Sequence, residues 1–97
     1  MNKAELVEKL AQETNMQLRD ARVMIDAIFD PDPAVGMIAR ELVAGRKVSI
    51  SGFGTFEARD RKARVGRNPH TGEALSIPAS RAPAWKAGKP LKESLRP

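Results

Sequence analysis

The stretch from Gly52 to Thr71 constrains this chain more than any other part of it. It places two phenylalanines ahead of five cationic side chains and closes on Gly-Arg-Asn-Pro. Its remaining apolar content is Val65 and a few alanines, so the stretch cannot fold back and bury a core of its own. Such a segment needs a partner outside itself, and a polyphosphate suits it best.

Positive charge is concentrated in the second half of the chain. Residues 1–45 carry five Lys and Arg and eight Asp and Glu, whereas residues 46–97 carry twelve and four. An acidic half is therefore followed by a half with a net charge of +8. This distribution indicates a nucleic acid or an anionic membrane surface as the partner.

Other functions are disfavoured by what the sequence lacks. No apolar run approaches the ~20 residues of a membrane-crossing helix, and an acid stands at Glu5, where a secretion signal would be apolar. We therefore expect a cytoplasmic protein with no membrane partner. The chain has no cysteine and one histidine, His70, beside a proline in a predicted turn. We accordingly expect no metal site, no cofactor, no small-molecule substrate and no enzymatic activity.

The chain is short enough to predict one domain over residues 1–97. It contains three Phe, one Trp and no Tyr, which is little aromatic content for a self-sufficient core. Small domains of this kind commonly gain stability by oligomerising.

Three helices are predicted in the first half. Apolar residues at positions 6, 7, 10 and 11 form one stripe on a helix from Asn2 to about Glu13, with Asn2 as its cap and Glu5 at the capping-box position. A second stripe at positions 18, 21, 24, 25, 28 and 29 follows Gln17, a weak cap.

The third helix is predicted to follow the Asp30-Pro31-Asp32-Pro33 run, which ends the second. Asp32 and Pro33 read as its cap and first residue, and Gly45 as its end. Gly36 within it obscures where the helix begins.

Strands are predicted from Lys47 onward. Val48 and Ile50 alternate with serines, and a turn or bulge at residues 52–54 precedes Phe56. Residues 57–66 and 73–77 then predict a two-stranded ribbon joined through residues 67–72 and closed by Pro78. A ribbon with charges on both faces should be mobile until it is bound. Residues 81–86 return to the sheet with Trp85 inward, and a short helix follows at about residues 90–96.

Strict alternation along the ribbon would place Arg59, Arg61 and Arg67 on one face. Lys62 and Arg64 would then lie on the other face, unless a twist or bulge reorients them.

The motifs from Gly52 to Thr71 resemble the signature of the bacterial HU/IHF family of histone-like DNA-binding proteins. The shared residues are Gly52-Phe53, Phe56, Arg61, Arg64, Gly66, the tip Asn68-Pro69, and Thr71. Motifs at residues 1–6, 72–73, 77–80 and 83–86 match the family in order and spacing, so that the resemblance covers nearly the whole chain. It is closest to HU.

The resemblance implies an α+β fold with a helical dimer base at about residues 2–45. An antiparallel β-sheet saddle and a protruding β-ribbon arm in each subunit would span about residues 47–86. The expected partners are double-stranded DNA and a second copy of the chain, although a paralogue could replace that copy. The protein would then be cytoplasmic and nucleoid-associated, binding duplex DNA with low sequence specificity.

The candidate DNA-binding residues have three origins. The arm supplies cations that can follow phosphates and enter a minor groove, and the Pro69 ring at its tip can wedge between base pairs in the minor groove and bend the duplex. Lysines outside the arm resemble the family's flanking contacts. The full set is Lys3, Arg59, Arg61, Lys62, Arg64, Arg67, Asn68, Pro69, Lys86, Lys89 and Lys92.

One departure from the family pattern is an apparent insertion at Pro31 to Gly36. It is either a tolerated surface loop or a protrusion that contacts a neighbouring dimer. For function, two alternatives stay open: a site-selective DNA bender like IHF, and a scaffold protein that docks structured RNA.

Overall fold

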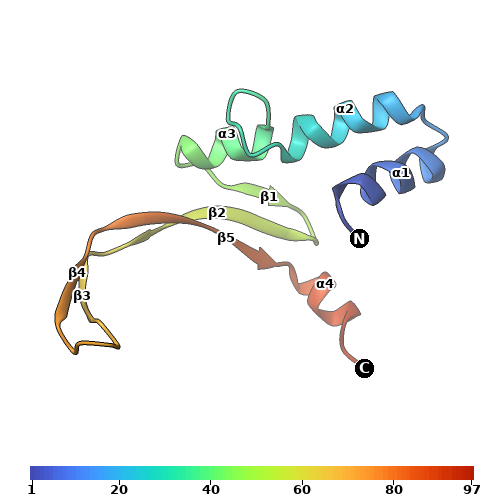
Figure 1. Ribbon diagram of the computed structural model, residues 1–97. Helices are drawn as coiled ribbons and strands as arrows, with labels where there is room; N and C mark the ends of the chain where they lie inside the picture. Colours follow the sequence, from blue (N-terminus) through green and yellow to red (C-terminus); the bar gives the residue numbers. More distant parts are fainter. The chain divides into compact units, whose positions relative to one another are not determined.

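The computed structural model describes all residues, 1–97, and shows the predicted α+β fold (Figure 1). The chain forms two compact units, a helical unit at Met1–Ala44 and a mainly β unit at Gly45–Pro97. No helix is both long and apolar enough to cross a membrane. That the two units act as one domain remains a prediction.

The helical unit begins with two helices, α1 at Lys3–Thr14 and α2 at Leu18–Phe29. The predicted cap of α1 is confirmed, because the Glu5 amide donates to Asn2 Oδ1 over 2.9 Å. Asn15 ends α1 in the left-handed region at φ 55°. Gln17 makes no side-chain capping bond to α2, as its weak capping propensity predicts.

The core between α1 and α2 is small. Only Val7, Ala21 and Ile25 are buried, with Leu6, Leu10, Ala11 and Met16 packed partly against them. Three large apolar side chains of the α2 stripe stay in solvent: Leu18 at 47% exposure, Met24 at 49% and Phe29 at 50%. The isolated chain therefore leaves much of its predicted helical stripe uncovered.

Helix α3, at Met37–Val43, starts later than predicted, so the assignment of Asp32 and Pro33 to its first turn was wrong. Asp32 does cap a turn, since its carboxylate accepts from the Ala34 amide, but extended backbone at Gly36 stops that turn from continuing as helix. A Cβ at Gly36 would lie 2.0 Å from the Asp30 carbonyl oxygen, so only glycine permits this close approach.

The β unit contains a three-stranded antiparallel sheet in the order β1, β2, β5. The strands are β1 at Val48–Ile50, β2 at Gly54–Arg61 and β5 at Ser80–Ala87. Gly54 is required by packing, because a Cβ there would lie 2.5 Å from Trp85 Nε1 and 2.6 Å from a backbone carbonyl. Trp85 lies over Phe53 and Phe56, with ring centroids 5.6 and 6.3 Å away, and remains 44% exposed.

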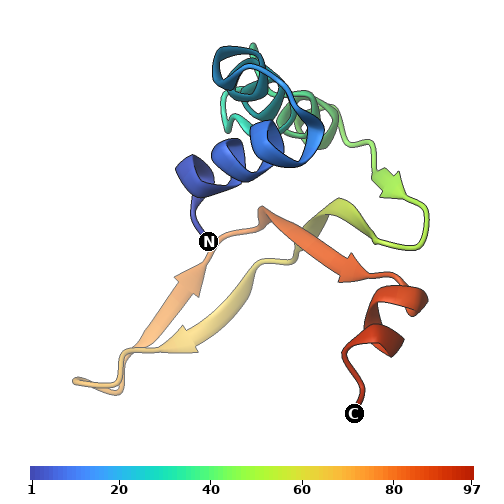
Figure 2. The same cartoon turned by 90° about the vertical axis from the view of Figure 1, so that its right-hand side faces the viewer.

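A second, two-stranded sheet pairs β3 at Arg64–Arg67 with β4 at Ala74–Ile77. Figures 1 and 2 both show it continuing outward from β2 and β5 as a narrow ribbon. The prediction of one strand over residues 57–66 was wrong, because pairing stops after Arg61 and resumes at Arg64. Pro78 lacks an amide donor and interrupts the opposite strand at the same level.

The chain ends in helix α4 at Lys89–Ser94, slightly ahead of the predicted range. Gly88 precedes it as the cap residue, and the proline at the second helical position is compatible with a helix start.

Candidate nucleic-acid interface

The three-stranded sheet has two chemically different faces. Its register pairs Thr55 with Lys86 and Arg59 with Ala82, whereas Phe56 pairs with Trp85. Side chains alternate along a strand, and directly paired residues share a face. One face is therefore mainly apolar, with Asp60 and Arg81 near its outer end. We call the other the cationic face; it carries Ser49, Thr55, Glu57, Arg59, Arg61 and Lys86.

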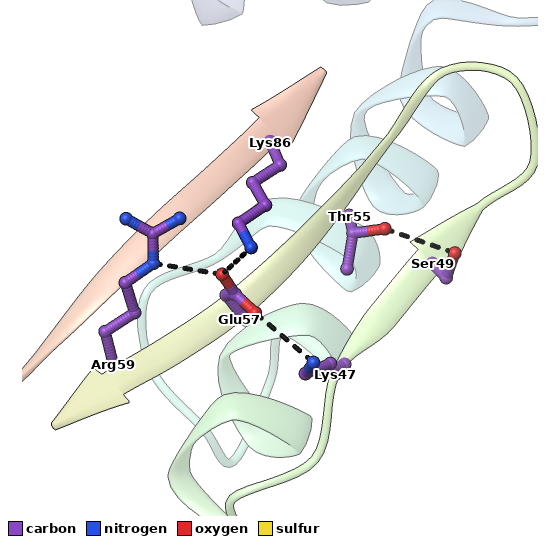
Figure 3. A network of polar contacts seen from close by, with 6 residues as sticks. All are labelled: Lys47, Ser49, Thr55, Glu57, Arg59 and Lys86. Atoms are coloured by element: carbon purple, nitrogen blue, oxygen red, sulfur yellow. Dashed lines mark hydrogen bonds and ion pairs between the residues drawn. The ribbon is translucent and has the colours of Figure 1, made fainter. Parts of the chain in front are cut away.

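Three cations converge on one carboxylate in the middle of the cationic face (Figure 3). Glu57 lies 3.0 Å from Arg59 Nε, 3.4 Å from Lys86 Nζ and 3.5 Å from Lys47 Nζ. The Glu57 side chain is only 9% exposed, but the side chains of the three cations are 52–69% exposed. The negative charge is thus covered, and the positive charges face solvent.

This arrangement shifts the titration of Glu57. The hydrogen bond from Arg59 is the main reason that the pKa of Glu57 lies below its ordinary value of 4.5. Burial acts in the opposite direction, and Lys86 and Lys47 add to the lowering. The carboxylate therefore stays ionised at neutral pH, and the cluster keeps a net positive charge.

The junction between sheet and ribbon forms a basic groove of about 360 Å³, lined by Arg61, Lys62, Arg64, Ile77, Pro78 and Ser80. The prediction that Arg59 and Arg61 share a face is confirmed by the register. The prediction that Arg67 shares this face does not follow from the register. The strand breaks at residues 62–63, so the alternation of side chains in β2 does not continue into β3. The break instead turns cations from both strands toward one groove.

The ribbon tip is held by its own hydrogen bonds. Asn68 anchors the turn, since its amide donates to the Glu73 carbonyl and its Oδ1 accepts from the His70 amide, both at 2.9 Å. Arg67 Nη1 donates to the Gly72 carbonyl at 3.1 Å. Pro69 is exposed within this turn, and His70 is an exposed turn residue, as predicted. The tip therefore presents the proline ring on an internally bonded loop.

The flanking lysines lie apart from these clusters. Lys89 and Lys92 are exposed on α4. Lys3 belongs to the helical unit and forms an ion pair with Asp26 on α2. The hydrogen bond and charge of Asp26 raise the pKa of Lys3 above its ordinary value of 10.5. An external anion would have to compete with Asp26 for Lys3.

Sequence reasoning missed two residues of this cluster: Glu57 on the cationic face, and Lys47, which precedes β1 and contacts Glu57. Lys47 lies two residues before Ser49. Residues two apart in a strand point to the same face, so extending strand β1 to Lys47 would have placed its side chain beside that of Ser49. Glu57 carried a signal as the acid nearest the start of the basic run. Only the pairing of the strands brings Lys86, which is far away in sequence, to the same carboxylate as Lys47.

A small helical unit joined to a basic-faced sheet and a basic ribbon defines the class of nucleic-acid-binding proteins with β-ribbon arms. Within that class, residues 1–96 match the family model described as bacterial DNA-binding protein. The chain belongs to this family of bacterial DNA-binding proteins, which includes HU.

Similar proteins cover essentially the full length of the chain. It is 45% identical to DNA-binding protein HU-1 of Halalkalibacterium halodurans over 99% of its own length and 100% of that protein's. It is 46% identical to DNA-binding protein HU of Geobacillus stearothermophilus over the same shares.

Among solved structures, Anabaena HU cocrystallised with DNA has a TM-score of 0.84 at 42% identity. The match covers 100% of this chain and 99% of the Anabaena chain. HU from Thermotoga maritima has a TM-score of 0.65 at 28% identity, and the match covers 99% of this chain and 100% of the Thermotoga chain. Both matches support the fold described above.

Proposed function

We propose that this protein is a histone-like architectural DNA-binding protein that grips duplex DNA through its phosphates, bends it and compacts the nucleoid. The observation that carries this proposal is the run of exposed cations along the cationic face, the junction groove and the ribbon. The Anabaena relative crystallised with DNA supports the same function.

The cations supply the grip. Arg59 and Lys86 on the sheet, and Arg61, Lys62 and Arg64 at the junction, contact successive phosphates. Arg67 extends this track toward the tip. Lys3, Lys89 and Lys92 make outer contacts, which are weaker for Lys3 because Asp26 already holds it.

The bend comes from the tip. Pro69 has a rigid apolar ring and no amide donor, so it can enter the minor groove and separate two base pairs. Unstacking costs a few kcal/mol per step, which the additional phosphate contacts along a bent duplex offset. Asn68 holds the loop that presents the ring.

Sequence preference should be low. A ribbon in the minor groove meets a degenerate pattern of hydrogen-bonding groups, and phosphate contacts carry no sequence information. A site-selective role like that of IHF would have to arise from the deformability of the DNA.

The binding unit is a homodimer. The core of the single chain is limited to Val7, Ala21 and Ile25, and large apolar side chains remain exposed in both units. A second copy would cover these surfaces and place two ribbons on one duplex. Sedimentation at equilibrium should therefore give twice the chain mass of 10.6 kDa.

The protein acts as a structural binder and not as an enzyme, and it resides in the nucleoid. The chain has no group of three or more His, Cys, Asp or Glu that could hold a metal ion. The single histidine, His70, lies in the tip turn, where its amide donates to Asn68 Oδ1.

A salt series tests the function. Binding to a nicked duplex should weaken with a log-log slope of about −5 or steeper, as roughly six neutralised phosphates require. A-form RNA of equal length should bind more weakly, because its minor groove is wide and shallow and does not enclose a ribbon that fits the minor groove of DNA. Equal affinity for both would favour the RNA scaffold, and weak binding with little salt dependence would refute the proposal.

A further inference from the structure

Glu57 is the one buried charged residue of the chain, with 7% of its surface exposed. It lies on the face that carries the sheet cations and not in the apolar core. Burying a carboxylate is unfavourable unless charge and hydrogen bonds compensate it, and here three cations do so. A buried acid on a DNA-binding surface requires an explanation, because it opposes the phosphates.

The three cations come from separate parts of the β unit. Lys47 precedes β1, Arg59 lies on β2 and Lys86 lies on β5. Without an anion between them, their mutual repulsion would drive the long side chains apart into solvent. The carboxylate offsets that repulsion and fixes the three head groups around one point (Figure 3).

The contact geometry leaves the outer sides of these cations available. Arg59 donates to Glu57 through Nε, and Figure 3 shows both Nη atoms directed away from the carboxylate. An oriented guanidinium can then present its outer edge to a phosphate in a bidentate contact. Lys47 and Lys86 remain 69% and 62% exposed. A phosphate can bind above the cluster while Glu57 stays beneath it.

We propose that Glu57 is a positioning residue that organises Lys47, Arg59 and Lys86 into one preformed phosphate site on the cationic face. The inference rests on the proposed DNA-binding function and adds a role for an acidic residue within it. It also adds Lys47 to the binding surface.

Whether Glu57→Gln raises or lowers the affinity for DNA distinguishes a positioning role from a purely electrostatic effect. Glu57→Gln removes a negative charge, so electrostatics alone would tighten binding to DNA. If Glu57 positions the cations, binding weakens instead, by about tenfold, because the freed side chains must then be ordered when DNA binds. The measurement is the dissociation constant for a short duplex in moderate salt.

Asp60→Asn is the matched control. Asp60 lies on the same strand but on the opposite face, is 89% exposed, and forms an ion pair with Arg81 at 3.9 Å. This variant makes the same change in net charge and should bind as tightly as the wild type or slightly tighter. Equal or tighter binding by folded Glu57→Gln would overturn the positioning role.

Two further measurements cover the case in which Glu57→Gln folds poorly. Glu57→Asp keeps the charge but shortens the side chain, and should also weaken binding. The Arg59 Nε–H signal in NMR should be protected from solvent in the wild type and lose protection in Glu57→Asp. Unchanged protection and affinity in that variant would refute the inference.

Failure of the broader function gives a different pattern. If the wild type and Asp60→Asn both fail to bind duplex DNA, the proposed function is wrong. If both bind and Glu57→Gln binds as well as they do, only the role of Glu57 is wrong.

Discussion

The sheet and the ribbon both present cations, but they hold them differently. On the sheet, Lys47, Arg59 and Lys86 surround a buried carboxylate, whereas Lys62 and Arg64 on the ribbon side have no acidic partner. The sheet cations are ordered before a ligand arrives, and the ribbon cations must be ordered by it. We infer that the sheet contributes most of the affinity and the ribbon most of the change in DNA shape.

Equal charge removal from the two regions should have unequal effects. Arg59→Ala with Lys86→Ala should weaken duplex binding by about a hundredfold, and Lys62→Ala with Arg64→Ala several times less, because ordering each free side chain already costs the wild-type ribbon about 0.5–1.5 kcal/mol. Titrations over a salt series measure both, and each pair should make the slope about two less negative. Equal losses from the two pairs would remove the distinction.

Adding a methyl group to a glycine should destabilise the sheet more than the ribbon. Gly54→Ala on the sheet would bring Cβ to 2.6 Å from the Lys86 carbonyl oxygen, which cannot yield, and should cost about 1–3 kcal/mol of unfolding free energy. Gly66→Ala on the ribbon meets the mobile end of Ile77 at 2.9 Å and should cost less. Thermal melting at equal protein concentration compares them, and a ribbon variant as unstable as the sheet variant would contradict the prediction.

The smallest effect should appear in acid. The pKa of Glu57 is lowered in the folded protein, so its ionised form stabilises the fold above the ordinary value of 4.5. That contribution is lost as the pH falls from about 4.5 through the folded pKa. Melting temperatures of Glu57→Gln should therefore fall less steeply than wild type over this acid range. Parallel profiles would show that the carboxylate does not stabilise the sheet.

Local patterns predicted much of this structure, and long-range pairing explains what they missed. The helices α1 and α2, the Asn2 cap and the strand β1 follow from patterns of neighbouring residues, and each is confirmed. The break after Arg61 was not predicted, because it depends on Pro78 in the opposite strand.

The candidate site divides in the same way. The sequence alone was enough to propose Arg59, Arg61 and the Pro69 tip, because the basic run is continuous in sequence. The meeting of Lys47, Glu57 and Lys86 depends on the register of three strands, and no local pattern shows it. The roles of all these residues in binding DNA remain predictions.

The central claim is that the ribbon tip bends DNA which the sheet surface grips. Energy transfer between dyes on the two ends of a duplex measures this directly, for saturating wild type and for Pro69→Ala. We predict a shorter end-to-end distance with the wild type, and with Pro69→Ala a distance close to that of free DNA at nearly unchanged affinity. A bend that persists undiminished in Pro69→Ala, or no bend with the wild type, would contradict the account.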